Sequence, residues 1–236
     1  MGVGSFTRLR PAAAAGRALV RLVRWRWLAA SAIIWTVFAA LTYLAARQTY
    51  LGPDLALARR VQSVDWGPLA LTFPAISWLG GIRGVVVSVL VVGLVAVANW
   101  RAVPFAAIVG IGAGQTYAVL NNVLQVPRPA ASLVRISEHP GGYGWPSGHV
   151  SFALVQVTLL VFAVAAVWLR RPARIALAVV GGLVVLTFVI QRVDVGAHWP
   201  SQTLGGLLVA SGWLTLALSI RPLSDPVLGA MSPSRT

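Results

Sequence analysis

The chain has 236 residues, of which 58% are hydrophobic and only 10% are charged. The hydrophobic residues stand in long uninterrupted runs, which excludes a soluble globular protein and indicates an integral membrane protein. The sequence contains no cysteine, and this excludes a disulfide framework, a thiol nucleophile and a thiolate metal site. The net charge of +14 comes from arginines, many of which flank apolar runs. We interpret that charge as a topology signal and not as a nucleic-acid-binding surface.

Six apolar runs are long enough, or nearly so, to cross a hydrocarbon core, which takes about 20 helical residues. They lie at residues 27–46, 84–99, 103–124, 148–169, 173–190 and 201–219. A further apolar stretch, residues 66–79, is short and contains Pro74, so we expect it to lie at the interface or to re-enter the membrane. The sequence predicts an all-α polytopic membrane protein, a six-transmembrane-helix bundle that forms one domain at residues 27–219.

The arginines predict how this domain is oriented. Twelve of the 19 lie before the first run, in the two short turns on the same side, or after the last run. Arginine is in excess on the cytoplasmic side of membrane proteins, so the sequence predicts an Arg-rich cytoplasmic N-terminus at residues 1–26. Residues 220–236 contain three prolines and are expected to form a disordered cytoplasmic tail. The expected location is a bacterial-type plasma membrane.

The segment Pro146-Ser147-Gly148-His149 opens the fourth run. The first amides of a helix lack intrahelical partners and carry the positive end of the helix dipole, so Ser147 and Gly148 can offer N–H groups to a phosphate. Gly148 leaves room for close approach, and His149 adds a side chain that titrates near neutral pH. The position of these four residues predicts an oxyanion site at the mouth of a membrane helix.

Six crossings bring other ionisable residues to the same outer face. Arg128-Pro129 follows the third run, Arg192 closes the fifth, and His198 lies just before the sixth. A single arginine or histidine at a membrane interface is often only an anchor that reaches toward water, which is our interpretation of Arg135. Two arginines and two histidines that converge from separate helices instead indicate one extracytoplasmic site.

These residues resemble the signature of the type 2 phosphatidic acid phosphatase superfamily. Its three segments match Arg128-Pro129, then Pro146 to His149, then Arg192 with His198 six residues later. The resemblance implies a helical bundle shared with soluble acid phosphatases and vanadium haloperoxidases. It also implies a lipid phosphate or undecaprenyl diphosphate phosphatase that uses a histidine nucleophile, without a metal or another cofactor.

Carried over to this chain, the resemblance makes His198 the nucleophile that forms a phosphohistidine, and His149 the general acid for the leaving alcohol. Arg128 and Arg192 would bind the equatorial phosphoryl oxygens, because a guanidinium matches phosphoryl geometry and stays charged. Ser147, with Gly148 and Pro129 as further substrate-binding residues, would complete the phosphate cradle.

The sequence departs from the family pattern at three positions. Asn121 stands where the family has a lysine, Gln202 where it has the aspartate that orients the nucleophile, and Gln191 where a serine precedes the arginine. We nevertheless place Asn121 and Gln202 at the substrate site. Asp194 could supply the missing orienting carboxylate, although an arginine-paired loop carboxylate is the simpler interpretation. Glu138 and His139, in the loop between the first two segments, are interpreted as surface groups and not as catalysts, and contact with the lipid headgroup stays open for both.

The expected substrate is a lipid phosphomonoester or diphosphate, with membrane lipid as the only other predicted partner, no nucleic acid and an undefined oligomeric state. Three alternatives remain open at this point: a lipid phosphotransferase, a weakened relative that only binds lipid phosphates, and a transporter with a coincidental motif. The ionisable residues gather at one mouth and not along a path through the membrane, which disfavours the transporter. Two histidines without a well-placed carboxylate or thiol also make a poor zinc site.

Overall fold

The structure is a computed structural model, and it describes residues 22–230. Most of the predicted N-terminal segment 1–26 and the last residues of the predicted tail therefore lie outside the described residues. Within residues 22–230 the regular structure is helical, and the one β-type contact is an isolated bridge between Val23 and Ile220. The prediction of an all-α fold is confirmed.

The helices, in chain order, are α2 (Trp25–Ala45), α3 (Asp54–Gln62), the 3-10 helix η1 (Gly67–Thr72), α4 (Phe73–Trp78), α5 (Ile82–Asn99), the 3-10 helix η2 (Trp100–Ala102), α6 (Val103–Leu124), α7 (Gly148–Thr158), the π-helix η3 (Leu159–Ala165), α8 (Ala166–Trp168), α9 (Arg171–Asp194), α10 (Pro200–Ser219) and α11 (Arg221–Gly229).

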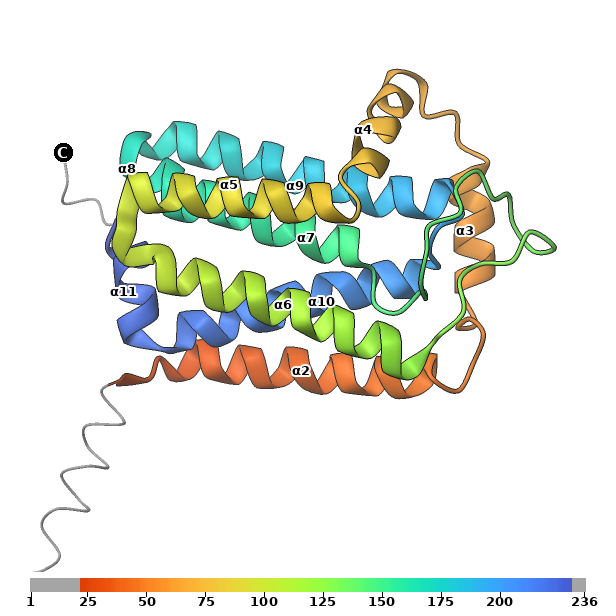
Figure 1. The fold of residues 1–236 in the computed structure, drawn as a ribbon, viewed down its shortest axis with the longest axis horizontal. Coiled ribbons are helices and arrows are strands. Elements are labelled where there is room, and N and C mark those ends of the chain that lie inside the picture. The colour runs from red at the N-terminus through yellow and green to blue at the C-terminus, as the bar shows by residue number, and fades with distance from the viewer. Residues whose placement is uncertain (1–21, 231–236) are drawn as a thin grey trace, which may run out of the picture.

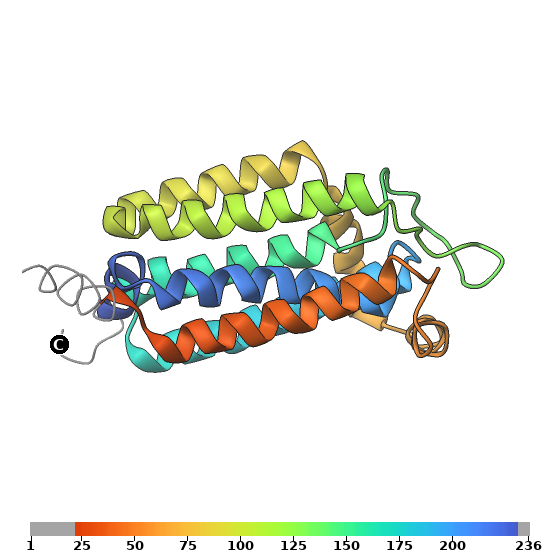
Figure 2. The ribbon, with the colours of Figure 1, turned by 90° about the horizontal axis from the view of Figure 1, so that it is seen from below.

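The long helices lie side by side along one axis (Figures 1 and 2). The short helices α3 and α4 and the loop between α6 and α7 gather at one end of this bundle, and α11 lies at the other end (Figure 1). The continuous segment Gly148–Trp168, which contains α7, η3 and α8, forms its centre together with α10, because 61% and 50% of the residues in their apolar windows are buried, against 17% for the other long helical segments. The two predicted histidines are thus attached to the two most buried helices.

Five helical segments of the described chain are long and apolar enough to cross a membrane. One of them, Ile82–Leu124, has 43 residues and contains α5, η2 and α6, which lie side by side in both views (Figures 1 and 2). The predicted count of six spans treats α5 and α6 as separate crossings, and it stays a prediction. The other four segments coincide with predicted runs to within a few residues.

Two segments outside the long helices bear on the sequence predictions. Residues 66–79 form η1 and α4, which are too short to cross a bilayer, and α4 begins with Phe73-Pro74 because proline is tolerated in a first helical turn. The prediction of a disordered tail from residue 220 is wrong for its first part, which forms α11. Val227 of α11 is 1% exposed and packs into the core, and this apolar face is what orders the segment.

A glycine sets the distance between the two central helices at the predicted phosphate motif. A Cβ atom built on Gly206 of α10 would lie 2.4 Å from the carbonyl oxygen of Ser147, so only glycine permits this approach. The amide of Ser147 also donates to the carbonyl oxygen of Gln202 across the same contact, at 3.0 Å. The start of α7 is therefore docked directly onto the first turns of α10.

Candidate active site

His198 lies at the centre of a buried polar cluster at the end of the bundle that carries α3 and α4. It stands two residues before α10, which begins at Pro200, and it is only 2% exposed. Nη1 of Arg128 lies 3.0 Å from Nε2 of His198. The loop after α6 and the turn before α10, 70 residues apart in the chain, thus meet at this histidine.

Two oxygen acceptors fix the imidazole of His198. Its Nδ1 lies 2.9 Å from the carbonyl oxygen of Gly144 and 3.2 Å from Oε1 of Gln202. Both groups only accept, so Nδ1 carries the ring proton and Nε2 holds the lone pair. The amide of Gln202 is itself oriented, because Nε2 donates to the carbonyl oxygen of Pro127 at 2.8 Å and Oε1 accepts the amide of Trp199 at 3.1 Å. A neutral glutamine therefore orients the ring without adding negative charge.

Burial lowers the pKa of His198 well below its usual value, and the neighbouring charges of Arg128 and Arg192 lower it further. Both effects disfavour the imidazolium. Burial also lowers the pKa of Arg128, and so does the charge of Arg192. His198 is consequently neutral at physiological pH, and the lone pair on its Nε2 faces Nη1 of Arg128. A neutral imidazole is the form that a nucleophile requires.

The glycine-rich loop before the motif covers His198. Arg128 donates to the carbonyl oxygens of Ala197 at 2.7 Å, Gly141 at 3.1 Å and Gly142 at 3.2 Å. A Cβ on Gly144 would lie 2.4 Å from Nε2 of Gln202, so the loop comes this close only because the residue is glycine. Carbonyl oxygens of the protein hold the donors of Arg128 in this arrangement.

The residues of the predicted phosphate motif are only partly arranged as the sequence suggests. Ser147 is the N-cap of α7, but its amide is engaged by Gln202 as described above and is not free for a ligand. Its hydroxyl oxygen is buried and has no hydrogen-bond partner in residues 22–230, and the same is true of Nε2 of His149. Buried polar groups are almost always paired, and Oε1 of Gln156 and Nε1 of Trp199 are the other buried side-chain atoms of the described residues without a partner. Gly148 borders Tyr117, whose ring carbon Cε2 would lie 3.0 Å from an added Cβ.

Arg192, at the end of α9, is 1% exposed and is held by three side chains. Its Nη2 donates to Oε2 of Glu138 and to Oγ of Ser77, each at 2.8 Å, and its Nε donates to Oε1 of Gln191. The interpretation of Glu138 as a surface group is wrong, because its carboxylate forms the ion pair of this buried arginine. Glu138 and Ser77 are residues that the sequence analysis did not place in the site. The scarcity of acids, five in the whole chain, is the signal that would have drawn attention to Glu138.

The remaining predicted residues have structural partners. Asn121 holds the backbone of Tyr143 through two hydrogen bonds, at 2.7 and 3.1 Å, and so anchors the loop over His198. Asp194 pairs with Nη2 of Arg135 at 3.0 Å, and the side chain of Arg135 is 59% exposed. Asp194 is therefore an arginine-paired carboxylate. Pro129 is half-buried next to Arg128.

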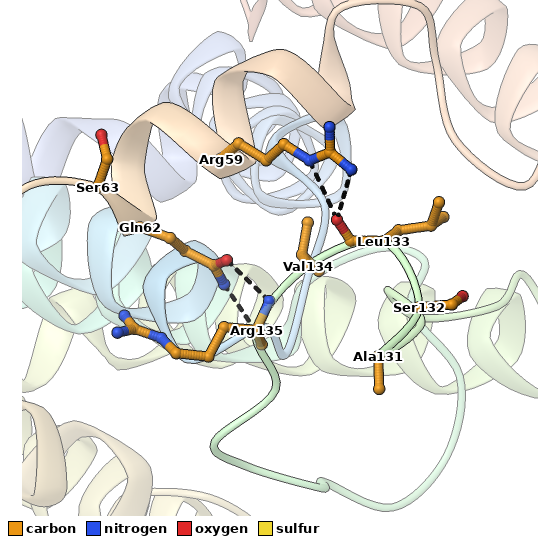
Figure 3. A pocket seen from close by; sticks show the side chains of 8 residues that line it. All are labelled: Arg59, Gln62, Ser63, Ala131, Ser132, Leu133, Val134 and Arg135. Atoms are coloured by element: carbon orange, nitrogen blue, oxygen red, sulfur yellow. Dashed lines mark hydrogen bonds between the residues drawn. The ribbon is translucent and has the colours of Figure 1, made fainter.

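A separate hollow of about 420 Å³ lies between α3 and the segment that follows Arg128. It is lined by Arg59, Gln62, Ser63 and residues 131–135, and none of these is a predicted site residue (Figure 3). Gln62 accepts from the amide and donates to the carbonyl oxygen of Arg135, at 3.0 and 2.8 Å, and so fastens α3 to the loop (Figure 3). In the described part of the chain no three carboxylate or histidine side chains gather where they could hold a metal ion.

Comparison with known proteins identifies the family of this chain. The model of the PAP2 superfamily matches residues 99–225, more than half of the chain, and the chain belongs to that superfamily. The fold is similar to a crystal structure described as the first transmembrane PAP2 type phosphatidylglycerolphosphate phosphatase from Bacillus subtilis. That match has a TM-score of 0.63 and 16% identity, and it covers 87% of this chain and 98% of the other. A search of the curated proteins found no match. The matched region contains both histidines and both arginines of the cluster.

Proposed function

We propose that the protein is a membrane lipid phosphate phosphatase that hydrolyses a phosphomonoester or diphosphate of a lipid through a phosphohistidine. The observation that carries this proposal is the state of His198, whose Nδ1 is fixed by Gly144 and Gln202 and whose Nε2 faces Arg128. Family membership supports the same chemistry. The two unpartnered atoms at Ser147 and His149 lie in the segment that the family uses for phosphate.

In the first step, the lone pair on Nε2 of His198 attacks phosphorus, and the bond from phosphorus to the leaving oxygen breaks. His149 gives a proton to that oxygen as the lipid alcohol or lipid phosphate departs. Arg192 and Arg128 neutralise the equatorial oxygens, because charge stabilisation and positioning lower most of the barrier in phosphoryl transfer. Arg128 turns from loop carbonyls to the phosphoryl group when substrate enters.

In the second step, water attacks the phosphohistidine, the phosphorus–nitrogen bond breaks, and inorganic phosphate leaves. His149 takes a proton from the attacking water, which reverses its first role. No step in this sequence requires a metal ion. Arg128 already lies 3.0 Å from the nitrogen of His198 that attacks.

The membrane setting supports a lipid substrate. A site at the end of a helical bundle can hold a phosphorylated headgroup in water while the tail stays in the bilayer. The arginine distribution supports a site on the extracytoplasmic face with both termini in the cytoplasm. Prenyl diphosphates and phosphatidate-like lipids are the two substrate classes to test first.

The test is phosphate release by the purified protein in detergent, from both lipid classes, with a metal chelator present. We expect release by the wild type and none by His198→Ala. Asp65→Asn, which changes an exposed loop carboxylate outside the cluster, serves as the matched control and should release phosphate normally. Equal release by the wild type and by His198→Ala would refute the proposed mechanism. Transfer of phosphate to an added alcohol, without free phosphate, would make the protein a transferase.

The second candidate is a weakened relative that binds lipid phosphates without turnover. It is favoured by Gln202, which brings no charge to the imidazolium, and by Asn121, which is committed to the loop backbone. Binding of a lipid phosphate without release of phosphate, in the same assay, would select this candidate.

A further inference from the structure

Ser77, Glu138 and Gln191 bind one edge of the Arg192 guanidinium, and we call these three residues the Arg192 clamp. Nε and Nη2 of Arg192 are held by all three side chains, whereas Nη1 has no hydrogen-bond partner in the described part of the chain. An arginine binds phosphate best through fixed donors in a planar fork. The clamp thus leaves one guanidinium nitrogen free and fixes the direction in which it points.

The hydroxyl of Ser77 is the centre of the clamp, and both its proton and its lone pairs are used in hydrogen bonds. The Ser77 hydroxyl accepts from Gln191 Nε2 and from Arg192 Nη2, each at 2.8 Å, and donates to Oε1 of Glu138. The carbonyl oxygen of Phe73 also lies within reach of this hydroxyl, at 3.2 Å. A hydroxyl has one proton and two lone pairs, so Ser77 has a partner for each of them. Gln191 Nε2 also donates to Oε1 of Glu138 at 3.2 Å. Such a network restrains each member more than any single contact would.

The backbone delivers Glu138 to this position. The amides of Ser137 and Glu138 both donate to the carbonyl oxygen of Val195, at 3.0 and 3.3 Å. Gly196, in the left-handed region at φ +71°, lets the chain pass there, because an added Cβ would lie 2.3 Å from the carbonyl oxygen of Arg135. The backbone of Glu138 is held through its amide and its carboxylate through the clamp, so Glu138 is not a loose loop residue that happens to meet an arginine.

We propose that the Ser77–Glu138–Gln191 clamp positions Arg192, with Glu138 as the carboxylate that keeps the buried guanidinium in place while Nη1 binds the phosphoryl group. A buried arginine needs a charged partner, and removing one member of a buried pair is costly. Glu138 meets this need, and its bonds go to the side of Arg192 away from Nη1. This inference rests on the proposed function, and it gives the short α4 segment, through Ser77, a role in the site.

A different role for Glu138 is competition, in which its carboxylate occupies the phosphate position and must leave when substrate binds. The two roles predict opposite effects of Glu138→Gln. A positioning role predicts weaker binding of inorganic phosphate and a lower kcat, because a displacement of about 1 Å costs up to about 100-fold in rate. Competition predicts tighter phosphate binding.

The experiment measures the Kd of inorganic phosphate and the kcat and KM for lipid phosphate, with Glu138→Gln and Ser77→Ala beside the wild type. We expect each variant to lose roughly 10- to 100-fold in kcat/KM, mostly in kcat, and to bind phosphate more weakly. Asp65→Asn is the matched control and should change neither quantity. Thermal unfolding of each variant separates loss of positioning from loss of the fold, and Ser77→Ala removes only one hydroxyl if Glu138→Gln does not fold.

A double-mutant cycle shows whether the clamp acts through Arg192. In an Arg192→Gln background, Glu138→Gln is expected to change kcat/KM by less than about threefold, because its partner is gone. Full additivity of the two losses would overturn the proposal, and so would tighter phosphate binding by Glu138→Gln. The Kd of inorganic phosphate can be measured without turnover. If the wild type releases no phosphate from lipids but Glu138→Gln binds inorganic phosphate more weakly than the wild type, the clamp is supported and the proposed hydrolysis is not.

Discussion

Oε1 of Gln202 lies 3.2 Å from Nδ1 of His198, and the carbonyl oxygen of Gly144 lies closer, at 2.9 Å. The ring proton is therefore held by two neutral acceptors at a place where the family pattern has a carboxylate. In a hydrolytic triad, loss of the orienting charge costs about 10⁴ in rate, mostly through the wrong tautomer. Here the tautomer is already set by Gly144, so only the electrostatic part of that cost remains.

We expect Gln202→Asp to raise kcat, because a carboxylate near Nδ1 stabilises the imidazolium and the developing positive charge on the ring. The gain should be about 10-fold and far below 10⁴, since the tautomer does not change. The variant should also lose about 1–3 kcal/mol of stability, because the carbonyl oxygen of Pro127 loses its donor. Steady-state phosphate release and chemical denaturation measure the two effects. A lower kcat would show that the site is adapted to a neutral orienter.

Asp194→Asn should leave kcat/KM within about twofold of the wild type. Asp194 pairs with Arg135, whose side chain is 59% exposed, and ion pairs this close to solvent contribute about 0–1 kcal/mol. The assay of phosphate release that is used for Gln202→Asp also measures the kcat/KM of Asp194→Asn. A loss above 10-fold would show that Asp194, four residues before His198, acts on the nucleophile.

The acidic limb of the pH profile should lie below the ordinary histidine range. Burial lowers the pKa of His198, so the neutral form, which the proposed mechanism requires, persists as the pH falls below about 6.5. Activity on the acid side is lost only when the pH reaches the lowered pKa in the folded protein. The pH dependence of kcat/KM reports this pKa for the free enzyme. A limb at or above about 6.5 would contradict a buried, neutral His198.

The same shift predicts the pH dependence of stability. The unfolded chain binds a proton on His198 at a higher pH than the folded protein, so the free energy of unfolding falls as the pH drops below about 6.5. The decrease continues until the pH passes the lowered pKa. Thermal unfolding of the wild type and of His198→Gln, measured at neutral pH and in steps below about pH 6.5, should show a weaker pH dependence in the variant.

Gly206→Ala should reduce kcat by about 100-fold, because the added methyl group would lie 2.4 Å from the carbonyl oxygen of Ser147 and must push α10 from the motif. Overpacking of this kind also costs about 1–3 kcal/mol. Gly114→Ala is the matched control, since nothing lies within 4 Å of its added Cβ. Activity assays and melting curves of the two variants compare them directly. Equal behaviour would mean that the contact of α7 with α10 does not position the site.

The sequence predicts much of this site because its signals are local. Apolar runs locate the long helices, and the positions of His198 and Arg128 near the ends of such runs bring them to one end of the bundle. Hydrogen bonds to the backbone cannot be predicted from residue types, because every residue provides a carbonyl oxygen such as that of Gly144. Glu138 shares no periodicity with Arg192, 54 residues away, so the pairing depends on the course of a loop. The prediction of a disordered tail from residue 220 is the clearest error, because the sequence alone does not show that Val227 packs into the core.

The central claim is that a phosphoryl group passes through Nε2 of His198. Phosphohistidine survives in base, so the measurement is an alkaline quench of enzyme mixed with a lipid phosphate, followed by mass spectrometry of the peptides that contain residues 192–203. The account predicts a phosphoryl group on His198 in the wild type and none in His198→Ala. Steady release of phosphate with no phosphorylated histidine, or with the phosphoryl group on another residue, would contradict it.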